Sequence, residues 1–358
     1  MRILAACSPG EVRIAVERDA ALADYVIWRP GAPDGIGDVF SGVVQTCAPA
    51  MGGAFVTLPG ERSGFLPTRE MLTEGMRVVV RVSRAAQGGK GVRLMRLDEP
   101  PGDALALLRR GPSPLERLAE QYPDAEIVVD AAAVIATLPR VLRPRIVRSA
   151  AAFDAATDAE VEALGAPDVM LPGGVRATIE PTKALVAIDL DWSDDTGRGG
   201  AQAQFAANAA ALPVLAAQIR LRNLSGAILI DPAGLGTRKR QALATPMRAA
   251  LADDPLSPEC LGATALGLLE IVRPRVRPPL HEMLHSPHGI GLDALRRILR
   301  EHTARNGTGA PTFRAAPSVV RALEADPDTL AAFATEYGAP LRLLPDPDCS
   351  MSRWSFAP

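Results

Sequence analysis

The sequence predicts an α/β (α+β) chain, with a small β-barrel near the N-terminus, a larger α/β domain after it and a small α/β region at the C-terminal end. Two patterns predict this fold class. Between residues 38 and 97, short strand-like runs follow one another with only Gly- and Pro-containing breaks between them, which is typical of a small barrel. After residue 113, strand-like and helix-like segments alternate, as they do in α/β domains.

Length and composition exclude several classes of protein. With 358 residues and 47% hydrophobic content, the chain can form two or three globular domains. A net charge of −2 argues against a protein whose whole surface binds nucleic acid. No stretch has the length of a membrane span and the N-terminus has no signal-peptide pattern, so we expect a cytoplasmic protein with no membrane partner. The cysteines are far apart, which indicates free thiols: Cys7, Cys47, Cys260 and Cys349.

Breaks in these patterns divide the chain into four expected segments. N-terminal strands, at 2–6 and 12–17, are expected to pack on the larger α/β domain. The expected boundaries are 1–37 for these strands, 38–97 for the barrel, 98–280 for the α/β domain, and 281–358 for a linker and small C-terminal domain. The expected barrel strands are Phe40–Gln45, Ala54–Leu58, Val78–Val82 and Val92–Leu97.

The larger α/β domain is expected to contain a hairpin, built from the apolar runs Val175–Glu180 and Ala184–Asp191. The Ala-rich segment Gln202–Leu221 is helical by composition, with Pro213 expected to kink or restart it. The other expected elements are helix Pro114–Gln121, strand Glu126–Asp130, strand Ala227–Asp231, helix Arg238–Ala252, strand Gly267–Val272 and helix Leu292–His302. Strands that alternate with helices and end on carboxylates, after an initial hairpin, indicate a ribonuclease-H-like layout.

Two apolar strands of this domain end on carboxylates. One run finishes with Asp189 and Asp191, and the other finishes with Asp231. Burial of such a strand would penalise a charged end unless the charge is paired or bound to a metal. Two strand ends side by side would offer oxygen ligands of the kind that Mg²⁺ or Mn²⁺ prefers. Such a site is suited to phosphodiester hydrolysis.

The two runs, Ile179–Asp191 and Arg220–Asp231, resemble the catalytic core of the ribonuclease E/G family. In that family a strand ending in Ile-Asp-x-Asn and a later Arg-Leu-Arg-Asn-Leu-Gly-Gly-x-Ile-x-Ile-Asp strand supply the metal carboxylates. The resemblance implies that Asp189 and Asp231 are the catalytic, metal-binding pair, with Asp191 as a third ligand where the family usually has Asn. Two positions depart from the family pattern: Lys183 stands at a usual Glu, and Gly234 stands at a usual acidic residue.

The barrel region resembles the S1-type OB-fold of the same family. The matching text is Gly42-Val43-Val44, Gly53-Ala54-Phe55-Val56, Gly64-Phe65-Leu66-Pro67 and Gly88-Gly89-Lys90-Gly91. The resemblance implies that Phe55, Phe65 and Lys90 hold single-stranded RNA, since aromatic rings stack on bases and a lysine follows the backbone. The alternative is that both phenylalanines belong to the barrel core.

Two arginine clusters are further candidates for RNA contact. Arg238 and Arg240 follow Asp231 at the position of a basic helix in the family. Arg273, Arg275 and Arg277 alternate at the end of a strand, which would place all three on one face. Both clusters could follow phosphates, or could be solvated charged surface that discourages strand pairing.

The histidines suggest two metal sites, neither of which we expect to form. His281-Glu282-Met283-Leu284-His285 fits the zinc peptidase pattern His-Glu-x-x-His, but the prolines before and after it leave too short a helix. His285 and His288 lie where the family has a Cys-Pro-x-Cys motif that shares zinc between two protomers. That motif is missing, so zinc and a zinc-linked dimer are not expected, and the oligomeric state stays open.

Together these features predict a magnesium-dependent endoribonuclease that cuts single-stranded RNA and resembles the ribonuclease E/G family. The resemblance implies that cleavage leaves a 5′-phosphate and a 3′-hydroxyl. The family's 5′-monophosphate sensor segment has no room between the barrel and Pro112-Ser113-Pro114. We therefore expect cleavage to be indifferent to the phosphorylation of the RNA 5′ end. The alternative is an RNA-binding protein that kept the barrel and lost the chemistry, which Lys183 and Gly234 favour.

Overall fold

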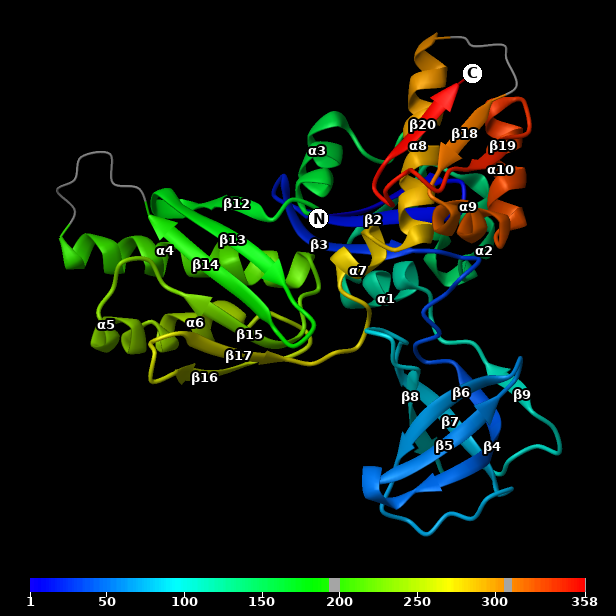
Figure 1. Ribbon diagram of the computed structural model, residues 1–358, viewed down its shortest axis with the longest axis horizontal. Helices are drawn as coiled ribbons and strands as arrows, with labels where there is room; N and C mark the ends of the chain where they lie inside the picture. The colour runs from blue at the N-terminus through cyan, green and yellow to red at the C-terminus, as the bar shows by residue number, and fades with distance from the viewer. Residues whose placement is uncertain (193–199, 306–310, 358) are drawn as a thin grey trace. The chain divides into compact units, whose positions relative to one another are not determined.

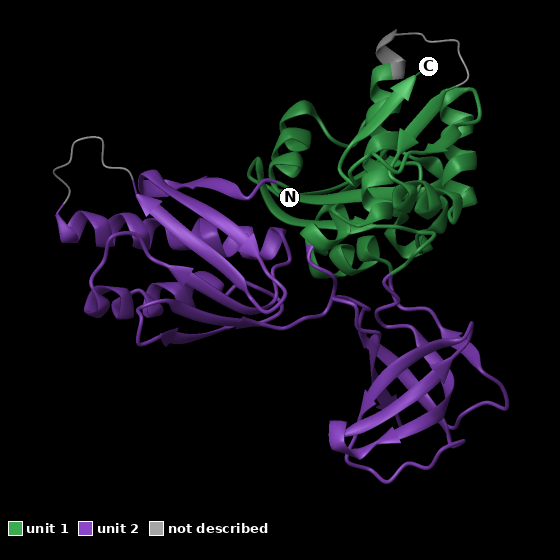
Figure 2. Ribbon diagram, viewed as in Figure 1, with its two compact units in different colours: residues 1–33, 113–165, 280–358 green, residues 34–112, 166–279 purple. Residues whose placement is uncertain are grey.

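The computed structural model describes residues 1–192, 200–305 and 311–357, and it confirms an α+β fold with a closed barrel (Figure 1). The chain divides into two compact units (Figure 2). Unit 1 consists of residues 1–33, 113–165 and 280–358, and unit 2 consists of residues 34–112 and 166–279. Within the described ranges, no helix combines the length and the apolar character that crossing a bilayer requires.

Unit 1 is built on a five-stranded sheet of order β11-β10-β1-β2-β3. Here β1 pairs antiparallel with β2 and parallel with β10, so two segments more than a hundred residues apart form one sheet. Its strands and helices are β1 (Arg2–Ser8), β2 (Glu11–Arg18), β3 (Ala21–Trp28), α1 (Pro114–Gln121), β10 (Glu126–Val129), α2 (Ala132–Thr137), β11 (Ile146–Arg148) and α3 (Ala155–Ala163). Helix α1 begins at Pro114, as the sequence predicts. Ser113 is its N-cap and forms a capping box with Glu116 in the first turn.

The C-terminal segment belongs to the same unit. Its elements are α7 (Leu280–Leu284), α8 (Pro287–Arg305), β18 (Thr312–Ala315), α9 (Pro317–Glu324), α10 (Pro327–Tyr337), β19 (Arg342–Pro345) and β20 (Trp354–Ala357). Buried Glu11 on β2 accepts hydrogen bonds from Arg29 Nε and from Arg296 Nη1 on α8, each at 3.1 Å. Residues 113–165 and 280–358 thus fall in the same compact unit as the N-terminal strands.

The barrel of unit 2 is closed, because β4 pairs with β7 on one side and with β5 on the other. Its strands are β4 (Val39–Ala48), β5 (Gly53–Leu58), β6 (Arg62–Pro67), β7 (Arg77–Arg84) and β8 (Val92–Leu97), with β9 (Ala106–Arg109) added to the edge of β4. Alternation directs one side of each strand to a small core that includes Phe40, Val56 and Leu66. The predicted strands are confirmed, whereas β6 and β9 were not predicted as strands.

The rest of unit 2 is a six-stranded sheet of order β12-β13-β14-β15-β17-β16. The elements are β12 (Asp168–Leu171), β13 (Val175–Pro181), β14 (Val186–Trp192), α4 (Ala201–Leu221), β15 (Gly226–Asp231), α5 (Thr237–Ala242), α6 (Ala244–Leu251), β16 (Glu259–Ala263) and β17 (Leu269–Arg273). The predicted hairpin is confirmed as the β13–β14 pair. Helix α4 runs through Pro213 as one helix, and the helix predicted over residues 238–252 is divided into α5 and α6.

A buried ion pair fastens the end of β17 to the loop after α6. Arg273 Nε donates to Asp254 Oδ2 at 2.7 Å, and Arg273 Nη1 donates to Asn223 Oδ1 at 2.8 Å and to Leu224 O at 3.1 Å. The side chains of Arg273 and Asp254 are 3% and 4% exposed. Removal of one partner would leave the other as an uncompensated buried charge.

We expect Arg273→Met to lower the free energy of unfolding by about 3–5 kcal/mol, because Asp254 would stay buried without its cation. Urea denaturation measures this change. The double variant Arg273→Met/Asp254→Leu should recover most of the loss, since it removes both charges. A single variant within about 1 kcal/mol of wild type would show that the pair is not a structural fastening.

Candidate functional site

The structure brings Asp189 and Asp231 together at neighbouring strand ends. Strands β14 and β15 are parallel, and their register pairs Asp189 directly with Asp231. Parallel strands require a crossover, which here contains α4, so both strands end at the same edge of the sheet. Adjacent strands lie about 4.8 Å apart. The carboxyl ends of parallel strands are also where open α/β sheets bind ligands.

Alternation along the two strands explains why these carboxylates are accessible. Ile188, Leu190 and Ile230 point into the core that α4 and α6 cover on one face of the sheet (Figure 1). Asp189 and Asp231 occupy the positions between or beside them and therefore lie on the opposite face. Asp189 is exposed and Asp231 is half-buried. The apolar runs thus form the core while their charged positions remain open to solvent or a ligand.

Of the three carboxylates at these strand ends, Asp189 is the one that has no direct ion pair among the described residues, although the nearby charge of Arg176 acts on it. It forms no ion pair with any described residue, whereas Arg176 Nη2 donates to Asp191 Oδ2 at 2.6 Å and Arg240 Nη1 donates to Asp231 Oδ1. Partial burial, then the negative charges of Asp191 and Asp231, raise the pKa of Asp189 above its usual range. A divalent cation beside Asp189 would relieve that repulsion.

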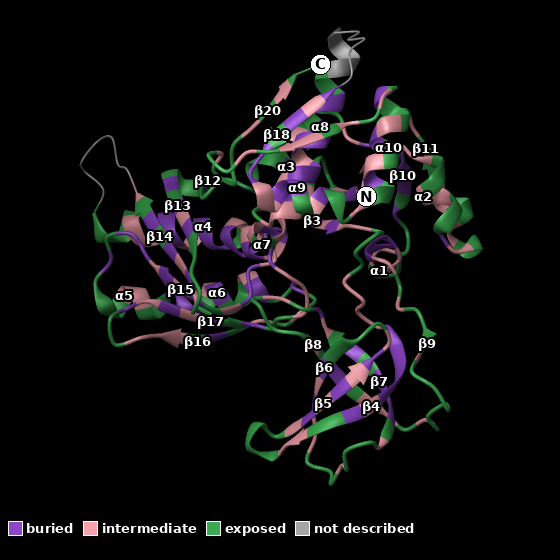
Figure 3. Ribbon diagram, turned by 45° about the vertical axis from the view of Figure 1, so that its right-hand side comes forward, coloured by how far each residue is buried: buried purple, intermediate pink, exposed green. Residues whose placement is uncertain are grey.

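The side chain of Arg240 is largely buried and hydrogen-bonded within the protein, so it is not a freely exposed RNA-binding residue. Its side chain is 19% exposed, and its Nε donates to Leu235 O at 2.6 Å while its Nη1 donates to Asp231. Gly267 makes room for it: a Cβ at Gly267 would lie 2.6 Å from Arg240 Cδ. Arg238, on the largely exposed helix α5 (Figure 3), is itself exposed, as a surface contact requires.

The residues present fit a magnesium ion better than a zinc ion. The described residues contain no group of three or more His, Cys, Asp or Glu side chains that could hold a metal, as a closed zinc site would need. Mg²⁺ commonly keeps several waters and binds through one or two carboxylates together with substrate phosphate. The adjacent carboxylates of Asp189 and Asp231 form a donor set of this smaller kind.

The two departures from the family pattern lie in different places. Lys183 is exposed in the turn between β13 and β14, six residues before Asp189 and so about 20 Å along the strand. Gly234 lies three residues after Asp231 and has φ +62°, and a Cβ there would lie 3.0 Å from Gln204 Nε2. The left-handed backbone favours glycine, so the loop beside Asp231 is built without an acid at this position.

Sequence reasoning missed Asn208, which holds this loop in place. Asn208 is fully buried on α4; its Nδ2 donates to Ala233 O at 3.1 Å and its Oδ1 accepts from Ala233 N at 3.0 Å. Both polar groups of the Ala233 peptide are thereby satisfied two residues after Asp231. The available signal was a lone Asn within an Ala-rich helical segment, because a buried amide requires partners.

The barrel presents the two predicted aromatic side chains on its outer surface. Phe55 on β5 pairs directly with Phe65 on β6, and their rings meet edge to face with centroids 5.4 Å apart. Both are half-buried and neither belongs to the barrel core, where Ala54, Val56 and Leu66 lie. The alternative of barrel-core phenylalanines is therefore wrong. Lys90 is exposed in the β7–β8 turn.

The expected arginine stripe does not form. Strand β17 ends at Arg273, which points into the core toward Asp254, so alternation does not extend to the next two arginines. Arg275 is exposed and its guanidinium lies over Gly226, where a Cβ would be 2.4 Å from Nη2. Arg277 is half-buried. Arg273 is thus a structural residue, and Arg275 is the most accessible member of the three.

The histidine motifs belong to unit 1, whereas the carboxylate pair belongs to unit 2. His281 and Glu282 lie on α7, which has five residues, and His285 follows it. His288 Nε2 lies within hydrogen-bond distance of Asp326 Oδ2, at 3.0 Å. Burial lowers the pKa of His281. Neither the peptidase pattern nor the pair His285 and His288 brings a third metal ligand among the described side chains.

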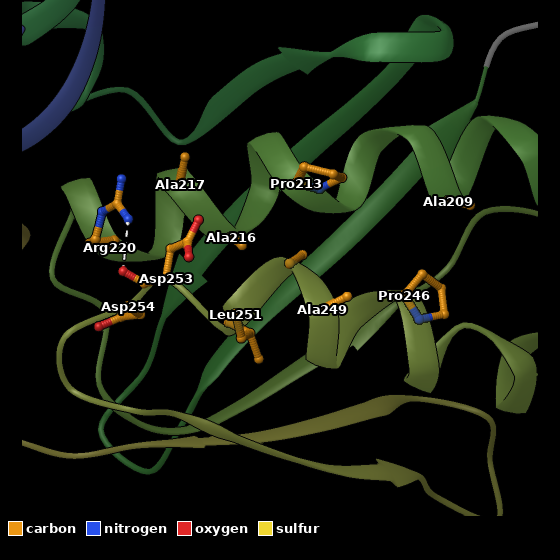
Figure 4. A pocket seen from close by; sticks show the side chains of 11 residues that line it. Ala209, Pro213, Ala216, Ala217, Arg220, Pro246, Ala249, Leu251, Asp253 and Asp254 are labelled. Atoms are coloured by element: carbon orange, nitrogen blue, oxygen red, sulfur yellow. Dashed lines mark hydrogen bonds between the residues drawn. The ribbon is translucent and has the colours of Figure 1, made fainter. Parts of the chain in front are cut away.

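A hollow of about 480 Å³ lies between α4 and α6 (Figure 4). Small and apolar residues dominate its walls, and at one end Arg220 Nη1 lies 3.5 Å from Asp253 O. Its lining residues are Ala209, Pro213, Ala216, Ala217, Arg220, Pro246, Ala249, Ala250, Leu251, Asp253 and Asp254. None of the predicted catalytic carboxylates lines it, so it is separate from the carboxylate pair.

The raised pKa of Asp189 predicts how stability depends on pH. Because the folded protein holds the Asp189 proton more tightly than the unfolded chain, ionisation of this group destabilises the fold as pH rises through and above the usual Asp range. At about pH 7 without metal, Asp189→Asn should therefore unfold at higher urea than wild type. The difference should vanish near about pH 3, where both forms are uncharged.

Asp168→Asn is the matched control, since Asp168 is an exposed carboxylate on β12, two strands from Asp189 in the same row. We expect this variant to lack the gain in stability at neutral pH. Addition of Mg²⁺ should raise the melting temperature of wild type and of the control, but not of Asp189→Asn. Equal urea midpoints for wild type and Asp189→Asn at both pH values would contradict the proposed repulsion.

Comparison with known proteins shows similarity to one family. Residues 127–276 match the model of the ribonuclease E/G family. Ribonuclease E of Escherichia coli is 22% identical over 390 residues, covering 77% of this chain and 37% of the relative, and ribonuclease E of Haemophilus influenzae is 22% identical over 77% of this chain and 42% of the relative. Ribonuclease G of Escherichia coli is 29% identical over 173 residues, covering 44% and 35%.

The chain thus spans about two fifths of the length of these two ribonucleases E. The alignment with the Escherichia coli protein runs over 390 positions yet covers 77% of this chain, so the relative has residues within that span that this chain lacks. The matched region contains β13, β14, α4 and β15, which carry the carboxylate pair. Over residues 127–276 the chain is therefore similar to the ribonuclease E/G family, and ribonucleases E and G are its relatives in that comparison.

Proposed function

We propose that this protein is a metal-dependent endoribonuclease that cuts single-stranded RNA, with Asp189 and Asp231 as the metal-binding pair. The observation that carries the proposal is the parallel register of β14 and β15, which sets these two carboxylates side by side on an accessible face. Similarity to a family of ribonucleases supports RNA as the substrate. Asp191 is the third carboxylate of the proposed site.

The chemistry follows from the charges of the site. A magnesium ion held by Asp189 and Asp231 would supply a Lewis acid, which activates water and neutralises phosphoryl charge. Hydrolysis adds the water oxygen to phosphorus and breaks the P–O3′ bond, leaving a 5′-phosphate on one fragment and a 3′-hydroxyl on the other. Manganese could replace magnesium at oxygen ligands. In the same site, Arg240 is placed to neutralise charge at Asp231.

RNA would be guided by the barrel and by exposed basic side chains beside the six-stranded sheet. The outward pair Phe55 and Phe65 offers ring faces or edges for stacking bases, and exposed Lys90 can follow the backbone. Exposed Arg238 and Arg275 can contact phosphate. All four cysteines are free thiols, which is typical of a reducing compartment, so the proposal places the reaction in the cytoplasm.

A second candidate is a non-catalytic RNA-binding protein. Gly234 favours it, because the acidic side chain expected next to Asp231 is replaced by a glycine in the left-handed region. The ion pair between Arg240 and Asp231 points the same way, since a metal would have to compete with this arginine for one carboxylate oxygen. The unpaired Asp189 favours the nuclease.

We expect wild-type protein with Mg²⁺ to cleave a fluorescent single-stranded RNA, and we expect EDTA to stop it. Asp189→Asn and Asp231→Asn should each reduce the rate by at least about a thousandfold, because each removes a metal-binding carboxylate whose charge acts on the transition state. Gel analysis of the fragments measures both rate and end groups.

RNA binding in EDTA separates the two candidate functions. Both Asn variants should bind RNA at least as well as wild type, since each removes a negative charge near the substrate. Asp168→Asn, two strands from Asp189, should cleave like wild type. RNA that is bound by wild type but never cleaved, at any Mg²⁺ or Mn²⁺ concentration, would establish the non-catalytic alternative.

The absent segment makes a further prediction about substrate choice. The barrel strand β9 ends at Arg109 and α1 begins at Pro114, which leaves no space for the sensor segment that the family resemblance implies. Cleavage rates on 5′-hydroxyl and 5′-monophosphate forms of one RNA should therefore agree within about twofold. A strong preference for the monophosphate would show that another part of the chain binds the 5′ end.

A further inference from the structure

One transverse row of outward side chains crosses four strands of the barrel. The register pairs Phe55 on β5 with Phe65 on β6, Phe65 with Arg93 on β8, and Arg93 with Arg84 on β7. Residues paired in register lie on the same face of a sheet. Three strand spacings of about 4.8 Å give a row about 14 Å long, with two aromatic rings at one end and two guanidinium groups at the other.

Burial confirms that the row faces outward. Leu66 beside Phe65 and Leu94 beside Arg93 lie in the barrel core, so Phe65 and Arg93 point away from it. On β7 the register shifts between Val82 and Arg84, and this β-bulge sets both Ser83 and Arg84 opposite Arg93. Arg93 is exposed, and Phe55, Phe65 and Arg84 are half-buried. A ligand on the barrel surface could therefore contact the aromatic and the basic end of the row at once.

The two arginines have no negative partner. Among the described residues, neither Arg84 nor Arg93 forms an ion pair with a carboxylate, and Arg84 Nε is buried without a hydrogen-bond partner. Burial and the nearby charge of Arg93 lower the pKa of Arg84. Like charges directly opposite each other destabilise a sheet. An anion between the two guanidinium groups would satisfy both.

We propose that Arg84 and Arg93 form a phosphate-binding site that continues the Phe55–Phe65 pair, so that single-stranded RNA crosses the barrel with bases on the rings and a backbone phosphate between the arginines. The inference rests on the proposed RNA substrate. Guanidinium groups suit phosphate because their N–H donors match its oxygens in pairs. An adjacent stacking surface selects a polyanion that carries bases, which single-stranded RNA provides.

Arg77 offers a matched control on the same strand. It is an exposed arginine at the start of β7, paired with Val43 on β4 and seven residues from Arg84. That separation places it about 23 Å away along the strand. Arg77→Ala therefore removes the same charge from the same barrel without touching the row.

The test is fluorescence anisotropy of a single-stranded oligouridine of about ten nucleotides, titrated with full-length protein in EDTA at several salt concentrations. Arg84→Ala and Arg93→Ala should each weaken binding about tenfold, and each should lower the slope of log K against log salt by about 0.7. Arg93→Lys should restore most of the slope. Phe65→Ala should weaken binding but keep the slope, since it removes stacking and no charge.

Melting temperatures guard against loss of fold: both arginine-to-alanine variants should melt at or above the wild-type temperature, because they remove like-charge repulsion. If wild type binds RNA and Arg84→Ala and Arg93→Ala resemble Arg77→Ala, the phosphate site is wrong while RNA binding stands. If wild type fails to bind the RNA, the proposed substrate and this site both fall. Loss of cleavage alone would leave the site intact, because binding is measured without metal.

Discussion

The parallel pairing of β14 and β15 is the constraint on which the rest of the candidate site depends. It sets Asp189 beside Asp231 at a distance where two carboxylates repel each other. The apolar positions of the same strands offset that repulsion, since they pack beneath α4 and α6 in the largest core of the protein. Asn208 holds the loop after Asp231 from the same helix that links the two strands. The crossover through α4 thus makes β14 and β15 parallel, which pairs the two carboxylates, and it also carries the residue that holds the loop after Asp231.

The way in which charges are balanced distinguishes structural from functional groups in this chain. Arg273 with Asp254, and Arg296 with Glu11, are buried pairs whose partners come from distant segments, and they hold the fold together. Asp189 on the sheet, and Arg84 with Arg93 on the barrel, are crowded by like charge without a counter-ion among the described residues. The first uncompensated group attracts a cation and the second attracts an anion. A metal ion would supply the positive charge at Asp189, and an RNA phosphate would supply the negative charge at Arg84 and Arg93.

Much of the fold and the carboxylate pair could be predicted from sequence because the signals were local. Apolar runs that end on Asp189 and Asp231 indicate buried strands with charged ends, and Ser113 and Pro114 mark the start of α1. The pairing of β1 with β10 could not be predicted, since it joins segments more than a hundred residues apart. Strand β9 is only four residues long and lies in a Pro-rich stretch of mixed polarity, so only its pairing with β4 reveals it.

The direction in which a side chain points near the end of a strand could not be predicted from the sequence pattern either. The spacing of Arg273 and Arg275 is that of two residues on one exposed face. Arg273 nevertheless points inward, because its guanidinium donates to Asp254 and Asn223 in the interior. From the sequence, Arg240 is expected to be a basic surface residue. In the structure its side chain packs against Gly267 and its guanidinium donates to Asp231. The like-charged pair Arg84 and Arg93 becomes visible only once the barrel register is known, because nine residues separate them in the chain.

Iron-mediated cleavage of the protein itself would locate the metal most directly. Fe²⁺ binds oxygen ligands as other divalent metals do, and with ascorbate and peroxide it generates radicals that cut the backbone beside the bound ion. If Asp189 and Asp231 hold the metal, cuts should fall next to these two residues and should disappear when excess Mg²⁺ competes. Cuts elsewhere, for example beside His281 and His285, or cuts that Mg²⁺ leaves unchanged, would contradict a metal centre at this carboxylate pair.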